Sequence, residues 1–247
     1  MSPRFGREEL RTRLRAASPG ILPSLLACDF AHLEREIHQV EVQEVPALHL
    51  DVMDGHFVPN LSIGILIVEA VRRVTDLPLD VHLMISDPAK YVEPFRKAGA
   101  DSLTIHVEAV ADPRPVLDKI RSLGVMAGLA LNPPTPLSAI EPCLGHCDMI
   151  LVMSVMPGFG GQKFDAEALG KLRELRERSD CDALLEVDGG IDLKTVGPCA
   201  EAGAELFVAG TAIFKTDEYA DTIRRLHSSA RTSVAGHSEA GRAHPKQ

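Results

Sequence analysis

The amino-acid sequence predicts a single-domain α/β protein with the TIM (β/α)8 barrel fold, in which a parallel sheet closes on itself. The chain has 247 residues, and one such barrel takes about 250. Eight short apolar segments alternate with polar segments of helical periodicity. They recur at intervals of roughly 20 to 35 residues, the length of one strand, one helix and two loops. A doubly wound open sheet is the alternative that this pattern leaves open.

The positions of these segments define the expected elements. Asp87 and Asp112 each precede a proline, which is typical of a helix start. Gly99, Gly124 and Gly203 lie where helices should stop. Strands are expected at residues 21–26, 47–53, 79–85, 102–107, 125–131, 148–155, 183–188 and 205–209. Helices are expected between them, at residues 30–42, 63–74, 87–98, 113–123, 165–178 and 192–202.

The two ends of the chain differ from the middle. Residues 20–228 are expected to form the barrel, whereas residues 1–19 and 229–247 are basic, lack an apolar period and should be flexible tails. The formal net charge is −9, so the body between the basic ends is acidic and should repel nucleic acid. No segment approaches the roughly 20 apolar residues that cross a membrane. Five cysteines without a framework spacing favour the reducing cytoplasm.

Histidine and aspartate residues alternate along two of the expected strands. Side chains of a strand alternate between its faces, so His49, Asp51 and Met53 share one face of the second strand. His82 and Met84 share a face of the third strand in the same way. If the residues between them pack outward against helices, these side chains point into the barrel near its C-terminal mouth.

A fourth candidate ligand ends the seventh expected strand, where Asp188 precedes two glycines. Because strand ends converge over one cavity in a barrel, His49, Asp51, His82 and Asp188 form a candidate site for one divalent metal ion. Four buried ionisable groups would be costly without a cation to neutralise them. Zn, Fe, Mn and Co all suit these ligands, and the ligand set does not choose among them.

Two carboxylates beside one metal ion indicate a particular chemistry. Inverting a carbon next to a carbonyl requires a base on one face and an acid on the other, which Asp51 and Asp188 could supply. A metal ion on the carbonyl oxygen would stabilise the enediolate formed between the two steps. Met53, Met84 and Met153 either form an apolar wall that keeps water away or simply fill the core.

Glycine-rich loops follow the last three expected strands. Residues 157–162 read PGFGGQ, Gly189 and Gly190 follow the seventh strand, and Gly210 and Thr211 follow the eighth. Glycine lets backbone N–H groups approach a phosphate closely, and a following helix N-terminus favours the anion. Barrels commonly place a phosphate at these late loops. Together the loops predict a phosphorylated ligand.

Longer segments extend these motifs. They are ILPSLLACDF at 21–30, LDVMDGHFVPNLSIG at 50–64, LDVHLMISDP at 79–88, ALNPPTP at 130–136, LVMSVMPGFGGQKF at 151–164, LEVDGGI at 185–191 and VAGTAIF at 208–214. With them the chain resembles the ribulose-phosphate 3-epimerase family from residue 20 to about 215. The resemblance implies the reversible conversion of D-ribulose 5-phosphate to D-xylulose 5-phosphate, in the pentose phosphate pathway or in carbon fixation. The implied route is two-base proton transfer at C3 through a metal-stabilised enediolate.

The resemblance also implies a role for each site residue. Asp51 matches the family's proton acceptor and Asp188 its proton donor. His49 and His82 match, with these two aspartates, the ligands of one divalent metal ion, and Ser24 matches a substrate contact. The other positions that match substrate and phosphate contacts are His82, Gly158, Phe159, Gly160, Gly161, Asp188, Gly189, Gly190, Gly210 and Thr211.

One departure from the family pattern bears on the substrate. Met156 stands where the family usually has Asn or Glu, and this bears on substrate preference. An epimerase of a hexulose phosphate such as allulose 6-phosphate is an alternative, since sister epimerases share these motifs. A phosphate-binding barrel lyase or decarboxylase is another, but those enzymes carry a lysine where this chain has Met53. A sugar-phosphate sensor without activity would not need both Asp51 and Asp188. The family suggests a homo-oligomer, a dimer or a hexamer, and the sequence does not choose between them.

Overall fold

Eight parallel strands form one sheet in the computed structural model, which describes residues 4–242, with side chains described through residue 235. The strands are β1 (Gly20–Pro23), β2 (Leu48–Met53), β3 (Leu79–Met84), β4 (Ser102–His106), β5 (Met126–Leu131), β6 (Met149–Met153), β7 (Leu184–Asp188) and β8 (Leu206–Ala209). Consecutive strands pair from β2 to β8, and β1 pairs with β8. A parallel bridge between Ser24 and His49 completes the ring. The predicted barrel is confirmed.

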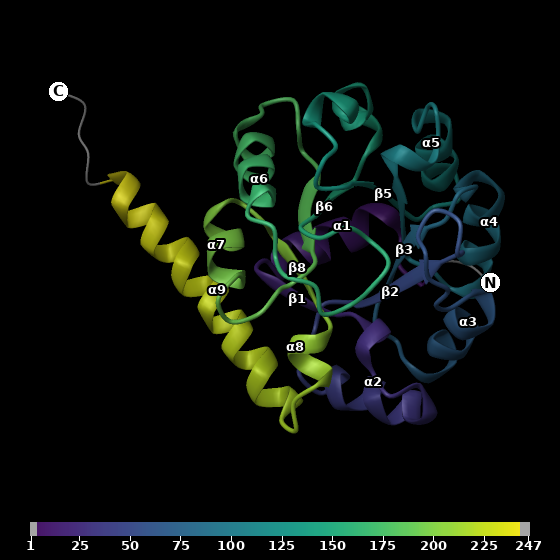
Figure 1. Cartoon of the computed structure of the whole chain (residues 1–247), viewed down its shortest axis with the longest axis horizontal. Coiled ribbons are helices and arrows are strands. Elements are labelled where there is room, and N and C mark those ends of the chain that lie inside the picture. Colours follow the sequence, from purple (N-terminus) through teal and green to yellow (C-terminus); the bar gives the residue numbers. More distant parts are fainter. Residues whose placement is uncertain (1–3, 243–247) are drawn as a thin grey trace.

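Helices surround the sheet and cover its outer face (Figure 1). They are α1 (Arg7–Ala16), α2 (Leu33–Glu41), α3 (Ile65–Val74), α4 (Pro88–Ala98), α5 (Arg114–Ser122), α6 (Glu167–Glu177), α7 (Val196–Glu201), α8 (Thr211–Phe214) and α9 (Tyr219–Arg242). Short 3-10 turns are η1 (Leu25–Ala27), η2 (Phe30–His32), η3 (Val107–Ala109), η4 (Leu137–Ala139) and η5 (Glu141–His146). Leu48, Leu50 and Val52 belong to the apolar layer between strands and helices. Their outward packing leaves the alternate residues of β2 inside the barrel, as predicted.

The helix stops predicted at glycines are confirmed. Gly99, Gly124 and Gly203 have φ angles of 117°, 81° and 106°, the left-handed conformation typical of a helix C-terminus. The starts are only partly as expected. Asp87 precedes α4 without a side-chain cap hydrogen bond, whereas Asp112 accepts a 3.1 Å hydrogen bond from the backbone of Arg114 in α5.

Helix α1 contradicts the expectation that residues 1–19 form a flexible tail. Leu10 and Leu14 lie one turn apart and are each only 1% exposed, because they cover the N-terminal end of the barrel. Their partners there are Leu22, Ala47, Met126, Met149, Leu184, Leu206 and Val208. An ion pair of 3.1 Å between Arg7 and Asp148 holds the helix from the side. Two leucines among charged residues are too weak a pattern to predict this packing, which depends on the apolar strand ends.

Helix α9 contradicts the expected tail from residue 229, since it continues to Arg242 and extends away from the barrel (Figure 1). Residues 243–247 lie outside the described part of the chain. Leu226 and Ala230 are fully buried against the domain. A Cβ atom at Gly197 of α7 would lie 2.8 Å from Ser233 Oγ, so this glycine lets the two helices approach.

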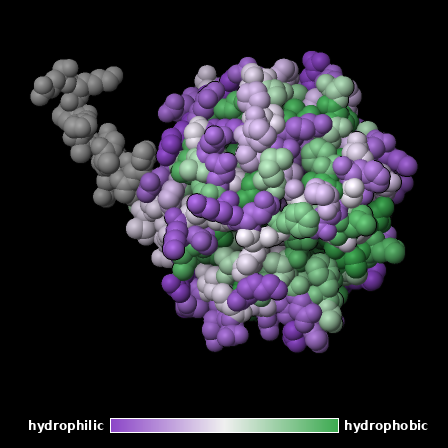
Figure 2. All heavy atoms as spheres, in the orientation of Figure 1, coloured by the Kyte–Doolittle hydropathy of each residue, from purple (hydrophilic) through white to green (hydrophobic). Residues whose placement is uncertain are grey.

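The face seen in Figure 2 carries many polar residues and an apolar area over α3. Leu61, in the loop before this helix, and Leu66, on it, are 74% and 78% exposed. Within residues 4–242, no helix is both long and apolar enough to cross a membrane.

Candidate active site

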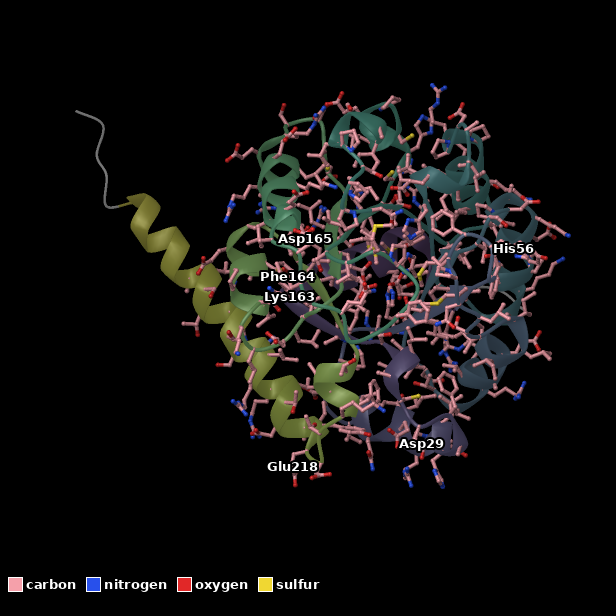
Figure 3. The ribbon with its side chains drawn as sticks, viewed as in Figure 1. Asp29, His56, Lys163, Phe164, Asp165 and Glu218 are labelled. Carbon is pink, nitrogen blue, oxygen red and sulfur yellow. The ribbon has the colours of Figure 1, made fainter. Side chains whose placement is uncertain are left out.

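A cavity of about 350 Å³ lies at the C-terminal ends of the strands, where barrels carry their ligands. Figure 3 shows Lys163, Phe164 and Asp165 in the loop after β6, across the ring from His56, which follows β2. The cavity brings together most of the predicted site residues, namely Ser24, Asp51, Met53, Met84, Met153, Gly158, Phe159, Gly160, Gly161, Asp188, Gly189, Gly190, Gly210 and Thr211. All three methionines therefore line it, as one of the two interpretations predicted.

The four predicted metal ligands lie together, with Asp51 and Asp188 lining this cavity and His49 and His82 fully buried beside them rather than on its wall. His49, Asp51, His82 and Asp188 each offer a ligand atom within 4.8 Å of the others. Strand register places Asp51 beside His82. Oδ1 of Asp51 lies 3.3 Å from Nε2 of His49 and 3.2 Å from Nδ1 of His82. Two imidazoles and two carboxylates at this spacing suit a divalent metal ion.

The His49 ring supplies a direct test of that fit. Its Nε2 is buried and lacks a hydrogen-bond partner, whereas its Nδ1 lies 2.7 Å from Oδ2 of Asp80. A buried nitrogen without a partner is costly. Because Nε2 of His49 faces the shared position beside Asp51, a metal ion there would give it the partner that it lacks.

The surroundings of Asp51 and Asp188 shift the pKa values of these two carboxyl groups in opposite directions. Burial and the negative charge of Asp51 raise the pKa of Asp188 to about 7. Burial also tends to raise the pKa of Asp51, but the charge of His49 and the contacts with the His49 and His82 rings outweigh it and hold the pKa well below its usual range. Burial lowers the pKa of His82. Despite its burial, the pKa of His49 is raised by Asp51 and Asp80.

Two carboxyl groups below the site were not predicted. Asp80 and Glu186 are 2% and 0% exposed, and an oxygen of Glu186 lies 3.7 Å from Nδ1 of His49. Burial and the charge of Asp80 raise the pKa of Glu186 well above its usual value. Both residues stand two positions before a predicted ligand, His82 or Asp188. The same strand alternation that identified the ligands could therefore have found them.

A second set of contacts that the sequence did not predict starts at His82. Nε2 of His82 lies 2.8 Å from Nε2 of His106, and Nδ1 of His106 lies 3.1 Å from Oε2 of Glu108. Burial lowers the pKa of His106 to about 4. Burial alone would raise the pKa of Glu108, but hydrogen bonds from His106, Thr135 and Asn132 lower it to about 2. His106 is the last residue of β4 and lies near the end of the strand expected at residues 102–107, and that position could have identified it.

The glycine-rich loops form the opposite wall of the cavity. The loops after β6 and β7 pack backbone to backbone, since a Cβ atom at Gly190 (φ +59°) would lie 2.7 Å from the nitrogen of Phe164. Cβ atoms at Gly160 and Gly161 would each lie 3.8 Å from the Thr211 hydroxyl. Lys215, just after α8, is the one Lys or Arg among the described cavity-lining residues, and the sequence did not single it out.

Met156 lies outside this cavity. Its side chain is 51% exposed and borders a separate depression with Pro133 and Pro134. Only its backbone helps to shape the loop, because its carbonyl accepts a 2.6 Å hydrogen bond from the Gln162 side chain. The departure from the family pattern at this position therefore does not alter the cavity lining.

Residues 20–214 match the ribulose-phosphate 3 epimerase family. The chain belongs to this family. The class of enzyme expected from the sequence, an epimerase of sugar phosphates, is thereby confirmed. Relatives called ribulose-phosphate 3-epimerase come from Bacillus subtilis, 48% identical over 85% of this chain and 98% of its own length, and from Synechocystis, 49% identical over 85% and 94%.

A plant relative and a more distant protein of known structure are also similar to this chain. A protein of Arabidopsis thaliana called ribulose-5-phosphate-3-epimerase, chloroplastic, is 45% identical over 87% of this chain and 78% of its own. Among solved structures, a mutant tryptophan synthase alpha-subunit from Pyrococcus furiosus aligns with a TM-score of 0.63 over 89% of this chain and 98% of its own. At 14% identity that likeness concerns the fold alone.

Proposed function

We propose that this protein is a ribulose-phosphate 3-epimerase that interconverts D-ribulose 5-phosphate and D-xylulose 5-phosphate. The observation that carries the proposal is the pair Asp51 and Asp188, whose carboxylates reach one cavity from β2 and β7, with β1 and β8 between those strands. A sensor or a simple binding protein has no need for two converging carboxylates. The names of the bacterial relatives support the same reaction.

The two carboxylates divide the proton transfer between them. Asp51 removes the proton at C3 from one face of the sugar, and Asp188 delivers a proton to the opposite face. The Ser24 hydroxyl donates a 2.6 Å hydrogen bond to Oδ2 of Asp51 and orients it. Run in reverse, the same pair exchange roles, so the reaction is reversible.

A divalent metal ion, Zn, Fe, Mn or Co, would be held by His49, Asp51, His82 and Asp188. When bound, it supplies positive charge that stabilises the enediolate oxygens as the C3 proton leaves. The buried and unpartnered Nε2 of His49 supports this assignment. Met53, Met84 and Met153 line the cavity above the ligands and exclude water from the reacting carbon.

The phosphate of the substrate would lie against the glycine loops. Residues 158–161, Gly189, Gly190, Gly210 and Thr211 line the same cavity, and glycine allows a phosphate to approach backbone N–H groups closely. Phe159 and the Thr211 hydroxyl would line the phosphate end of the cavity, and Lys215 adds a positive charge there. His82 lies beneath the sugar, beside Asp51.

The alternatives predict different products. A hexulose-phosphate epimerase would use the same carboxylates, whereas a lyase of this fold would need a lysine at the position of Met53. The decisive experiment measures conversion of ribulose 5-phosphate to xylulose 5-phosphate in deuterated water, with and without a chelator. We expect deuterium at C3, loss of turnover on chelation, and about 10³-fold lower turnover in Asp51→Asn and Asp188→Asn. Full activity in either variant, or faster turnover of allulose 6-phosphate, would refute the proposal.

We further propose that the protein works as a cytoplasmic homo-oligomer, either a dimer or a hexamer. The exposed apolar area at Leu61 and Leu66 supports self-association, because such areas often mark protein contacts (Figure 2). The five cysteines are free thiols, which agrees with a reducing compartment. Light scattering of the purified protein tests the association.

A further inference from the structure

We propose that His106 and Glu108 are positioning residues that hold His82 with Nδ1 unprotonated and turned toward the metal position. This inference rests on the proposed metal site. Neither residue lines the cavity, and His106 reaches the site through its contact with His82. They act on the reaction only through the orientation and proton placement of the His82 ring.

The contact between the two histidines is a hydrogen bond between ring edges. Their ring centroids are 4.9 Å apart with planes inclined by 24°, and their Nε2 atoms are 2.8 Å apart. The two nitrogens therefore lie between the rings, and one must donate while the other accepts. Both rings are fully buried, which favours the neutral form of His106. The direction of this one hydrogen bond decides which nitrogen of His82 carries the proton.

Glu108 sets that direction. A carboxylate can only accept, so Nδ1 of His106 must donate to Oε2 of Glu108 across 3.1 Å. The Nε2 of neutral His106 then carries the lone pair and accepts from Nε2 of His82. His82 is left with its lone pair on Nδ1, the atom that lies 3.2 Å from Oδ1 of Asp51. That is the nitrogen a metal ion needs.

Glu108 is itself held in place by donors from the next loop. The backbone N–H of Asn132 donates to Oε1 across 2.8 Å, and the Thr135 hydroxyl also donates to Oε1. On the far side of His106, the Phe57 ring lies 4.8 Å away, centroid to centroid. The imidazole is thus confined between an aromatic ring and a fixed carboxylate. A carboxylate that orients a ligand through its other nitrogen is the arrangement expected behind metal-binding histidines.

The discriminating variant is Glu108→Gln. The backbone N–H of Asn132 still requires an acceptor, so the amide oxygen should stay there and the NH2 group should face Nδ1 of His106. That nitrogen must then accept, which reverses both hydrogen bonds and puts the proton of His82 on Nδ1. Glu108→Ala removes the acceptor without imposing the reversed order. Glu108→Gln should therefore weaken metal binding more than Glu108→Ala does.

Zinc affinity, measured by competition with a chromophoric chelator, tests this without an activity assay. We expect about 100-fold weaker binding in Glu108→Gln and about 10-fold weaker binding in Glu108→Ala. His106→Phe keeps the packing against Phe57 but removes the acceptor, and should also lose about 10-fold. The matched control is Glu36→Gln, a buried carboxylate of α2 that accepts from Tyr219 across 2.6 Å, and its zinc affinity should be unchanged.

The proton positions can be read directly in the folded protein. In ¹⁵N-histidine-labelled protein, nitrogen chemical shifts distinguish protonated from unprotonated ring nitrogens, and His82→Asn identifies the relevant signals. We expect Nδ1 of His82 to be unprotonated in the natural protein and protonated in Glu108→Gln. Equal zinc affinity in the natural protein, Glu108→Gln and His106→Phe, or an unchanged His82 tautomer, would overturn this inference. Failure to epimerise ribulose 5-phosphate would instead overturn the proposed function.

Discussion

The hydroxyl of Ser24 lies 2.6 Å from Oδ2 of Asp51, at the seam where the barrel closes. At the same seam, Ser24 also forms a parallel bridge with His49, and this bridge joins the ends of the first two strands. Ser24 thus occupies one oxygen of Asp51, while His49 and His82 face the other. The proposed base is therefore held on both sides, and its orientation depends on closure of the sheet.

Replacing that serine tests the orientation of the base. Ser24→Ala removes the hydrogen bond without adding bulk, so Asp51 should keep its charge but lose its fixed direction. We expect turnover to fall by about 10-fold to 100-fold, because general-base catalysis depends on correct geometry, with little change in thermal stability. Steady-state kinetics provide the measurement, and Ser24→Thr, which keeps the hydroxyl, is the control. Unchanged turnover in Ser24→Ala would show that the contact does not orient the base.

Metal uptake should depend on pH through Asp188. Burial and the charge of Asp51 raise the pKa of Asp188 to about 7, and a carboxyl group must lose its proton to bind a metal ion. Below that value protons compete with the metal, so affinity should fall by up to roughly tenfold per pH unit. His49, whose pKa is also raised, adds to the loss in the same direction. Zinc titrations at pH 6, 7 and 8 measure this, and constant affinity would contradict it.

Truncating a leucine of α1 that packs on the N-terminal end of the barrel should destabilise the protein without changing its catalytic rate. Leu14→Ala deletes a side chain that is 1% exposed, which typically costs about 2 to 5 kcal/mol of unfolding free energy. The cavity with Asp51 and Asp188 lies at the other end of the strands, so kcat should be unchanged where the variant is folded. Urea unfolding measures the loss. Leu66→Ala, at a position 78% exposed, is the control and should have little effect.

A methyl group at Gly190 should disrupt the proposed phosphate end. The residue has φ +59°, and its Cβ would lie 2.7 Å from the backbone nitrogen of Phe164, which cannot move as a flexible side chain could. We expect Gly190→Ala to raise KM for the sugar phosphate by about 10-fold or more, an affinity loss of about 1.4 kcal/mol. Gly170→Ala, in a helix with open space around it, should leave KM unchanged. Equal KM values in the two variants would argue against a phosphate at this loop.

The eight strands and the inward face of β2 could be predicted from the sequence alone. Parallel strands are buried on both sides, and their apolar segments form a strong local pattern. The alternation of side chains along one strand then places His49, Asp51 and Met53 together without any knowledge of the fold. Family motifs supplied the roles of Asp51 and Asp188, because those motifs are continuous in the chain.

The contacts between distant segments could be seen only in the folded barrel. The packing of Leu14 under the barrel, the contact between His82 and His106, and the hydrogen bond from Asn132 to Glu108 join segments that share no local period. Their partners come from other strands, and the free energy of such contacts depends on burial that exists only once the sheet has closed. The sequence thus located the ligands of the proposed metal ion, whereas the closed barrel determined what holds those ligands in position.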